Sequence, residues 1–266
     1  MGLDKFIPEN ILFVESHSLK TLNLATNETW LIAGKTASRG YSQGTGETTR
    51  FNGPFSFHQR NSTDVIILDS NNGCIRTLSR LTNTTEILAG FCTIPGDIDG
   101  PLRSARLGKP EKVVELEPDV LAFTDVASYS IKKLDLAHEQ VSTLAQIHEP
   151  VFGLAKRPNS ADLIFTFNGG LGKVDLCNLN VEYLTQSIYT GIRDGPLSLS
   201  NVTSAVFTPR PETLVFLNEY IMILTGYQTH LLRVVNFASN YVSSICDPSL
   251  EGNITSSGDI ETCRIR

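Results

Sequence analysis

Short runs of alternating apolar and polar residues recur along the whole chain, at a spacing typical of β-strands. The clearest run is Val120–Asp125, which is followed after a turn by Ile131–Leu136 and then by Val141–Leu144. Val113–Leu116 precedes this stretch and shows the same alternation. The pattern predicts four short strands joined by tight turns, and therefore one antiparallel sheet.

The second strand of this unit occurs in five copies along the chain. The spacing between successive copies is about 54, 55, 43 and 57 residues. Periods of this length, with four strands in each, predict the blades of a β-propeller. We expect an all-β, five-bladed propeller with blade boundaries near residues 34, 90, 146 and 187. The five second strands are ILFVES (Ile11–Ser16), VIILDS (Val65–Ser70), VLAFTD (Val120–Asp125), LIFTFN (Leu163–Asn168) and YIMILTG (Tyr220–Gly226).

An amphipathic third strand follows each second strand, and each contains a basic residue next to an apolar one. Because side chains alternate between the two faces of a strand, we expect the basic side chains on a solvent-exposed face and the Leu or Val neighbours inside. The basic residues are Lys20, Arg76, Lys132, Lys173 and Arg233.

The loops before the first strands also repeat. Asp99-Gly100 and Asp194-Gly195 occupy equivalent places, and the fourth strands of two copies end in Ala33-Gly34 and Ala89-Gly90. This pattern resembles the NHL-repeat β-propeller family over nearly the whole chain. The fourth copy lacks the Asp-Gly loop, and five copies are recognisable where six are commoner in the family. A six-bladed propeller is therefore the alternative to five blades.

The two ends of the chain are complementary in this pattern. The chain begins in a second strand, and Gly252–Ile265 resembles the loop that is missing there. We expect one propeller domain over residues 1–266, closed by N- and C-terminal segments in one blade, with Phe6-Ile7 as the innermost strand of that blade. Such closure removes an exposed sheet edge.

Composition limits the classes of partner. The net charge is −6 and the 22 basic residues are scattered, which argues against nucleic-acid binding. No apolar stretch approaches the ~18–20 residues that a membrane-spanning helix needs, so we expect no membrane insertion. The first residues lack the apolar segment of a signal peptide. Because the sequons and cysteines described below indicate the secretory pathway, we expect a secreted protein or an extracellular part of a larger one.

Five Asn-x-Ser/Thr sequons fall in predicted turns and loops, where a glycan can be attached. They predict a glycoprotein of the secretory pathway. Asn and Thr are also common turn and strand residues, which is the alternative explanation. The sequon residues are Asn27, Asn61, Asn83, Asn201 and Asn253.

The five cysteines support the same compartment. We expect disulfides Cys74–Cys92 and Cys246–Cys263, each of which closes a short loop. The second bridge would hold the C-terminal segment in its blade. Cys177 is left over, and it is either a small buried apolar residue or the site of an intermolecular disulfide in an oligomer.

The acidic residues that end the second strands are candidate metal ligands. Glu15, Asp69 and Asp125 offer oxygen atoms suited to calcium. The alternative is that these side chains accept hydrogen bonds from the turn that follows them, as in Asp69–Gly73. Asp99-Gly100 is explained in the same way, by turn chemistry.

Other polar residues give no coherent catalytic set. Predicted first strands carry one polar residue each that faces the axial channel, but the residue types differ from blade to blade: His58, Glu115 and Lys156. The five histidines match no zinc-binding spacing. No nucleophile or phosphate-binding motif is present in the sequence.

These observations favour a non-enzymatic extracellular module for binding, cell adhesion or recognition, with a protein or glycan ligand on a propeller face. We expect no cofactor. The first alternative is a calcium- or zinc-dependent secreted propeller hydrolase or lyase. The second is a structural subunit of an extracellular assembly, linked through Cys177.

Overall fold

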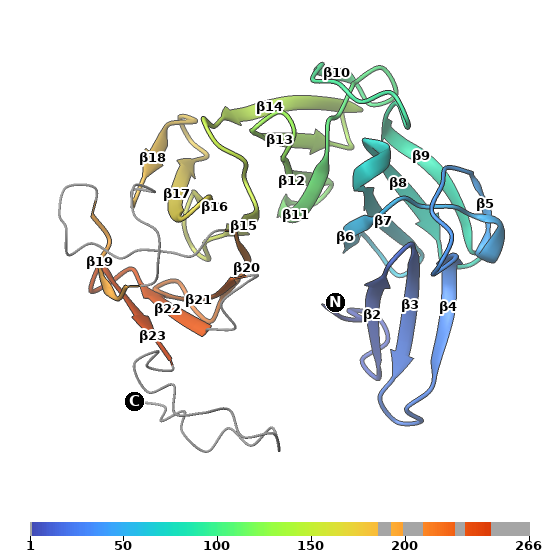
Figure 1. Ribbon diagram of the computed structural model, residues 1–266, viewed down its shortest axis with the longest axis horizontal. Coiled ribbons are helices and arrows are strands. Elements are labelled where there is room, and N and C mark those ends of the chain that lie inside the picture. The colour runs from blue at the N-terminus through green and yellow to red at the C-terminus, as the bar shows by residue number, and fades with distance from the viewer. Residues whose placement is uncertain (1, 186–192, 199–209, 227–231, 246–266) are drawn as a thin grey trace. The chain divides into compact units, whose positions relative to one another are not determined.

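The chain folds as a five-bladed, all-β propeller (Figure 1). The structure is a computed structural model that describes residues 2–185, 193–198, 210–226 and 232–245. In these residues the strands form five antiparallel sheets of four or five strands, and each sheet is one blade. Two compact units divide the chain, Met1–Pro150 with blades 1 to 3 and Val151–Arg266 with blades 4 and 5.

The first unit contains three sheets with nearly the same strand pattern. Blade 1 comprises β1 (Gly2–Leu3), β2 (Asn10–Glu15), β3 (Ser18–Asn23) and β4 (Thr29–Gly34). Blade 2 comprises β5 (Gly44–Thr45), β6 (Pro54–Gln59), β7 (Asp64–Asp69), β8 (Cys74–Ser79) and β9 (Thr84–Gly90), with 3-10 turns η1 (Gly46–Thr48) and η2 (Ser70–Asn72). Blade 3 comprises β10 (Gly100–Pro101), β11 (Pro110–Glu117), β12 (Val120–Asp125), β13 (Ser130–Asp135) and β14 (Gln140–Gln146).

The second unit repeats the pattern in two sheets. Blade 4 comprises β15 (Gly153–Lys156), β16 (Asp162–Phe167), β17 (Gly170–Asp175) and β18 (Val181–Tyr183). Blade 5 comprises β19 (Gly195–Pro196), β20 (Pro211–Phe216), β21 (Ile221–Gly226), β22 (Leu232–Asn236) and β23 (Tyr241–Ser244). The predicted blade boundaries at residues 34, 90 and 146 coincide with the ends of β4, β9 and β14, whereas residue 187 lies outside the described residues.

A short strand from the incoming loop is added to three of the blades. β5, β10 and β19 each pair with the outermost strand of the blade that follows the loop, namely β9, β14 and β23. Two of these short strands are the Asp-Gly loops that repeat in the sequence. In the described residues, no such strand covers β4 of blade 1 or β18 of blade 4.

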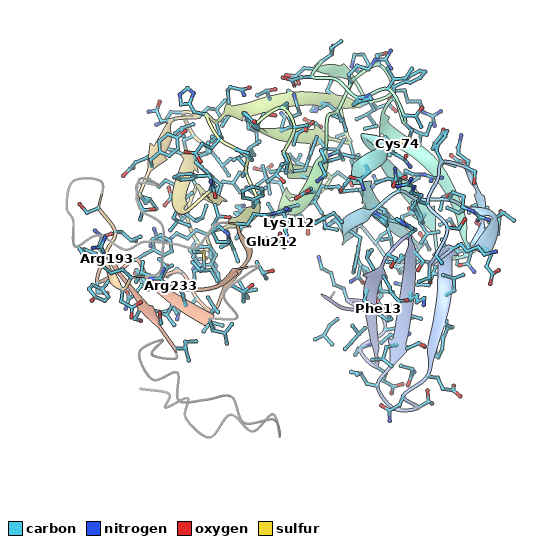
Figure 2. All side chains as sticks on the ribbon, in the orientation of Figure 1. Phe13, Cys74, Lys112, Arg193, Glu212 and Arg233 are labelled. Carbon is cyan, nitrogen blue, oxygen red and sulfur yellow. A yellow bond between two sulfur atoms is a disulfide. The ribbon has the colours of Figure 1, made fainter. Side chains whose placement is uncertain are left out.

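Both faces of the inner strands are buried, and side chains project from both faces of the sheets (Figure 2). In β7, all residues from Val65 to Asp69 are buried. Ile67 belongs to a cluster with Leu19 of blade 1, whereas its neighbour Ile66 belongs to a cluster with Phe123 of blade 3. Within the first unit the apolar core therefore lies between consecutive blades, and this explains why its second strands are almost continuously apolar.

The N-terminus does supply the strand next to β2, but the residues differ from the prediction. Gly2 pairs with Leu12 and Leu3 with Ile11, whereas Phe6 and Ile7 lie in the connection to β2. The backbone amides of Phe6 and Ile7 donate to Asp4 Oδ1, and this local turn keeps the two residues out of the sheet. The C-terminal segment 252–266, with its predicted closing role, lies outside the described residues.

Candidate functional site

The alternation predicts that the basic residues of all five third strands are exposed, but three of them are buried. The exposed fractions of Arg76, Lys132 and Arg233 are 0%, 1% and 2%, whereas Lys20 and Lys173 are partly exposed. The prediction of a solvent-exposed face is thus wrong for blades 2, 3 and 5. The physical reason is that in these three blades the incoming loop covers the face of the sheet from which the cation projects, so this face does not reach water.

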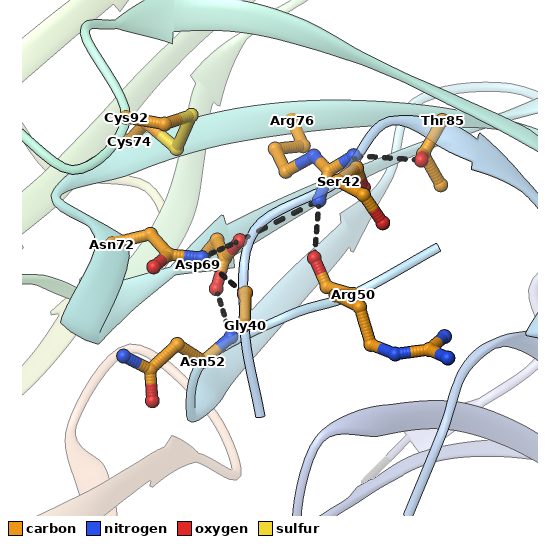
Figure 3. The surroundings of a disulfide bond; sticks show 10 residues. All are labelled: Gly40, Ser42, Arg50, Asn52, Asp69, Asn72, Cys74, Arg76, Thr85 and Cys92. Carbon is orange, nitrogen blue, oxygen red and sulfur yellow. Dashed lines mark hydrogen bonds and ion pairs between the residues drawn. A yellow bond between two sulfur atoms is a disulfide. The ribbon is translucent and has the colours of Figure 1, made fainter. Parts of the chain in front are cut away.

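Arg76 links the loop before blade 2 to the blade itself (Figure 3). Its guanidinium donates to the carbonyl oxygens of Arg50 and Ser42 at 2.8 and 2.9 Å, and to Thr85 Oγ1 at 2.8 Å. Asp69 Oδ2 lies 3.6 Å from Nη1, and both side chains are fully buried. Burial raises the pKa of Asp69 and lowers the pKa of Arg76, so the hydrogen bonds and the mutual attraction offset a desolvation cost.

Lys132 has the same role in blade 3, with carboxylates in place of carbonyls. Its Nζ lies 2.7 Å from Asp97 and 2.8 Å from Asp99, and it also donates to Thr143 Oγ1. The second oxygen of Asp99 accepts the backbone N–H of Thr143 at 2.7 Å. Burial alone would lower the pKa of Lys132 and raise that of Asp99, but these contacts reverse both shifts. Asp99 is therefore a partner of a buried cation as well as a turn residue.

The second unit repeats this arrangement in blade 5. Arg233 Nη2 lies 3.1 Å from Asp194 Oδ1 and donates to the carbonyl oxygen of Arg193. Asp194 Oδ2 accepts the backbone N–H of Ser244 at 2.9 Å. The aspartates of the two Asp-Gly loops thus make the same two contacts: each binds the cation of the third strand and accepts a backbone N–H of the fourth strand. The fixed order of Asp-Gly and third-strand cation in both copies is the sequence signal for it.

The predicted metal ligands contact different partners. Asp69 accepts the backbone N–H of Asn52 and the side-chain amide of Asn72, both at 2.8 Å. Asp125 accepts the backbone N–H groups of Gly108 and Lys109, both at 2.7 Å. Both acids therefore hold the segment before a first strand. Only the bond from Asn72 to Asp69 comes from the following turn, so the turn interpretation is confirmed for Asp69 and does not describe the contacts of Asp125.

Glu15, the third predicted ligand, forms an ion pair with Lys20 on the next strand. Within the part of the chain that the structure describes, no three His, Cys, Asp or Glu side chains are arranged to hold a metal ion.

The predicted Cys74–Cys92 disulfide is present, with an S–S distance of 2.05 Å (Figure 3). It joins the start of β8 to the beginning of the loop 91–109, which we call the braced loop. The backbone groups of Ile98 and Arg106 exchange hydrogen bonds of 3.0 and 2.9 Å within this loop. The loop is therefore fixed by a covalent bond, a backbone bridge and the Lys132 ion pairs.

The braced loop exposes large apolar side chains. The exposed fractions of Phe91, Ile94 and Ile98 are 46%, 50% and 57%. The guanidinium of Arg106 lies 4.2 Å from the centre of the Phe91 ring, a distance suited to a cation–π contact. Apolar side chains on a rigid exposed loop are typical of a protein-binding surface.

A polar cavity of about 270 Å³ lies elsewhere in the same unit, between blades 2 and 3. The structure brings together two of the predicted channel residues at this cavity, His58 on β6 and Glu115 on β11. Lys156 lies on β15, in the second unit. The remaining lining residues are Arg60, Asn61, Pro118, Asp119, Leu121 and Leu136.

Three of the sequons lie in turns, as predicted. Asn27 and Asn83 are exposed at the turns between third and fourth strands, with positive φ angles of 58° and 55°. Asn61 is partly buried, and its Oδ1 accepts the backbone N–H groups of Thr63 and Asp64. Asn201 and Asn253 lie outside the described residues.

Cys177 is exposed, so the interpretation as a buried apolar residue is wrong. It follows β17, where the chain turns towards β18, and its backbone N–H donates to Asp175. Among the described residues it forms no disulfide. The predicted pair Cys246–Cys263 lies outside those residues.

Comparison with known proteins extends the description of the fold. No family model matches the sequence, and no curated protein matches it either, so the resemblance to NHL repeats stays a prediction. In the described part of the chain, the helices are too short for any of them to cross a bilayer.

Several solved β-propellers have a similar structure. An auxiliary nutrient binding protein from Bacteroides thetaiotaomicron matches 92% of this chain with a TM-score of 0.64 and 10% identity. A second auxiliary nutrient binding protein, from Bacteroides ovatus, matches 90% with a TM-score of 0.63 and 11% identity. This chain spans 56% and 54% of their lengths. A chain of a nidogen/laminin complex, of which 81% is covered, matches 90% of this chain with a TM-score of 0.57 and 13% identity. At these identities the comparisons show that the chain has a β-propeller fold.

Proposed function

We propose that this chain is a non-enzymatic, extracellular binding module that recognises a protein ligand through the braced loop. The observation that carries the proposal is the combination of rigidity and exposure in that loop. Ile94 and Ile98 are at least half exposed, yet the backbone that carries them is fixed by the Cys74–Cys92 disulfide and by Lys132. A preordered apolar surface loses little conformational entropy on binding.

Further observations support an extracellular location and a recognition role. A disulfide persists in oxidising compartments, and Asn27 and Asn83 offer exposed sequons on turns. Two of the similar propellers are named as nutrient binding proteins and a third occurs in a nidogen/laminin complex. These names fit a binding role.

The test is a binding assay with the secreted protein on intact cells and on purified extracellular-matrix proteins. The double variant Ile94→Ser/Ile98→Ser is expected to weaken binding about tenfold or more, because it removes two apolar contacts of the type that dominates interfaces. Leu81→Ser is the matched control, since Leu81 is 79% exposed on a turn outside the braced loop. Equal binding by the double variant and the control would contradict the proposal.

The exposure of Cys177 favours a second candidate, a structural subunit of a disulfide-linked assembly. Its test is the mass of the secreted protein without reductant, with Cys177→Ser as the comparison. A dimer that disappears in the variant would support this candidate, and a monomer in both would exclude it.

The alternative function, a calcium- or zinc-dependent hydrolase or lyase, can be tested by metal binding. Unfolding temperature is measured with calcium, with zinc and with a chelator, for the wild type and for Asp125→Asn. A rise with either metal in the wild type alone would favour this alternative over the binding module.

A further inference from the structure

The cavity between blades 2 and 3 is lined by a largely buried histidine whose ring makes no hydrogen bond to the described residues. His58 on β6 is only 9% exposed and lines the cavity. In the described residues neither ring nitrogen makes a hydrogen bond, and Glu115 Oε2 lies 3.9 Å from Nε2. Neither nitrogen is shut off from solvent, so both are available to a ligand that enters the cavity.

His58 presents both a donor and an acceptor to the cavity. Burial lowers its pKa more than the charge of Glu115 raises it, and Lys5 lowers it further. The imidazole is therefore neutral at pH 7, with one N–H donor and one unprotonated nitrogen. A ligand hydroxyl can pair with either nitrogen, because it donates and accepts.

The charged groups around the cavity are balanced in pairs. Arg60 Nε lies 2.7 Å from Asp119 Oδ1, and Lys5 Nζ lies 3.5 Å from Glu115 Oε2. The position of Lys5 is fixed by a hydrogen bond from its backbone N–H to Gln59 Oε1. Each ion pair involves one oxygen of its carboxylate, and both acids line the cavity. This balance favours neutral ligands over ions.

Apart from Asn61, the remaining lining residues of the cavity are apolar, namely Pro118, Leu121 and Leu136. A volume of about 270 Å³ lies at the lower end of ligand pockets and suits one small ring. A lining that combines carboxylates, a guanidinium and an imidazole with apolar side chains matches a pyranose, whose hydroxyl groups project from its edge and whose C–H groups form its faces. We propose that this cavity binds one pyranose ring.

The ring has two possible sources. It can belong to a free or partner-borne glycan, or to a glycan on Asn61, because Asn61 itself lines the cavity and begins the sequon Asn61-Ser62-Thr63. Both sources present the same chemistry. The proposal is independent of the braced loop, so it can fail without affecting the proposed function, and the converse holds too.

The experiment is a saturation-transfer NMR titration of the secreted protein with methyl pyranosides of glucose, galactose, mannose and N-acetylglucosamine. Thr63→Val removes the sequon and the hydrogen bond from Thr63 Oγ1 to Asn61 Oδ1, but it keeps Asn61 and the two backbone N–H bonds to Asn61 Oδ1, so it separates the two sources. We expect dissociation constants of about 1 mM in the Thr63→Val protein. Binding to both forms identifies an external glycan, and binding to Thr63→Val alone identifies the Asn61 glycan as the natural occupant.

Two further substitutions test the geometry in the Thr63→Val background. Glu115→Gln and His58→Phe are expected to weaken binding about tenfold. Glu117→Gln is the matched control, because Glu117 is an exposed acid on the same strand and does not line the cavity. Two results would overturn the proposal: no binding of any of the four sugars to the Thr63→Val protein, or equal binding by Glu115→Gln and Glu117→Gln.

Discussion

The third-strand cations differ sharply between two sets of blades. In blades 2, 3 and 5 the cation is buried and binds the loop that enters the blade. In blades 1 and 4 the cation is partly exposed and pairs with acids of its own sheet, Lys20 with Glu15 and Lys173 with Glu182. The cation at this position thus binds a loop in blades 2, 3 and 5, whereas in blades 1 and 4 it forms a partly exposed ion pair.

The difference follows the short strands of the incoming loops. Blades 2, 3 and 5 have β5, β10 and β19 on their outer strand, whereas the described residues provide no such strand for blades 1 and 4. The loop covers the cation and removes it from water, and the loop also supplies the oxygen atoms that the cation needs. The same loop therefore both buries the cation and pairs with it. This is expected, because a buried charge without a partner would be strongly destabilising.

The largest effect that we expect separates Arg76 from Lys20. Arg76→Met leaves Asp69 and two loop carbonyls without their partner in a fully buried site, so it should lower the free energy of unfolding by about 3–5 kcal/mol. Lys20→Met removes a partly exposed pair and should cost about 1 kcal/mol or less. Urea unfolding of both variants measures the difference. Similar losses would mean that burial does not distinguish the two positions.

The disulfide should have the next largest effect, because the bridge fixes the braced loop from its other end. Cys74→Ala/Cys92→Ala opens a bridge with a sequence separation of 18. The loss expected from chain entropy is about 3 kcal/mol. Unfolding of the double variant in urea measures it, with Cys177→Ser as a control that should match the wild type. If the double variant unfolds at the same urea concentration as the wild type, the disulfide does not brace the loop.

Much of the fold could be predicted from the sequence because the local signals were strong. The second strand Val120–Asp125 is found as β12 with the same bounds, and the boundary at Gly90 coincides with the end of β9. Alternation, turn residues and a constant period all agree there. The disulfide also followed from spacing and the repeat.

The environment of the cations could not be predicted from alternation. The rule that polar side chains face water assumes a sheet with one wet face, but β8 and β13 are covered on both faces. Arg76 and Lys132 therefore alternate with apolar residues and are still buried. His58 and Glu115 approach each other from different blades, 57 residues apart in the sequence, and no local pattern reports such a contact.

The contribution of the Lys132–Asp99 ion pair to the free energy of unfolding should depend on pH. Because the pKa of Asp99 is lower in the folded protein than its usual 3.8, the pair stabilises the fold above about pH 4. That contribution is lost as the pH falls through the lowered pKa. We expect about 1 kcal/mol at most, because Asp99 is 40% exposed and solvent screens its charge.

Asp99→Asn should therefore flatten the stability profile below pH 4 relative to the wild type. Unfolding in urea at several pH values between 2 and 7 measures this. Parallel profiles for the two proteins would show that the pair contributes nothing through ionisation.

The smallest effect concerns the sequons and leaves stability nearly unchanged. Asn27 and Asn83 are exposed on left-handed turn positions, whereas Asn61 is partly buried with its side chain held in a turn. Mass spectrometry of peptides from secreted protein should find higher glycan occupancy at Asn27 and Asn83 than at Asn61. Higher occupancy at Asn61 would instead show that its turn opens before or during glycan transfer.

Hydrogen exchange of the braced loop tests the central claim most directly, namely that a buried third-strand cation keeps an exposed loop rigid. The variant is Lys132→Met, and Lys173→Met is the control from a blade without a loop strand. We predict that amides of residues 96–106 and of Thr143 exchange about tenfold or more faster in Lys132→Met, and at the wild-type rate in Lys173→Met. Unchanged exchange of these amides in Lys132→Met would contradict the account.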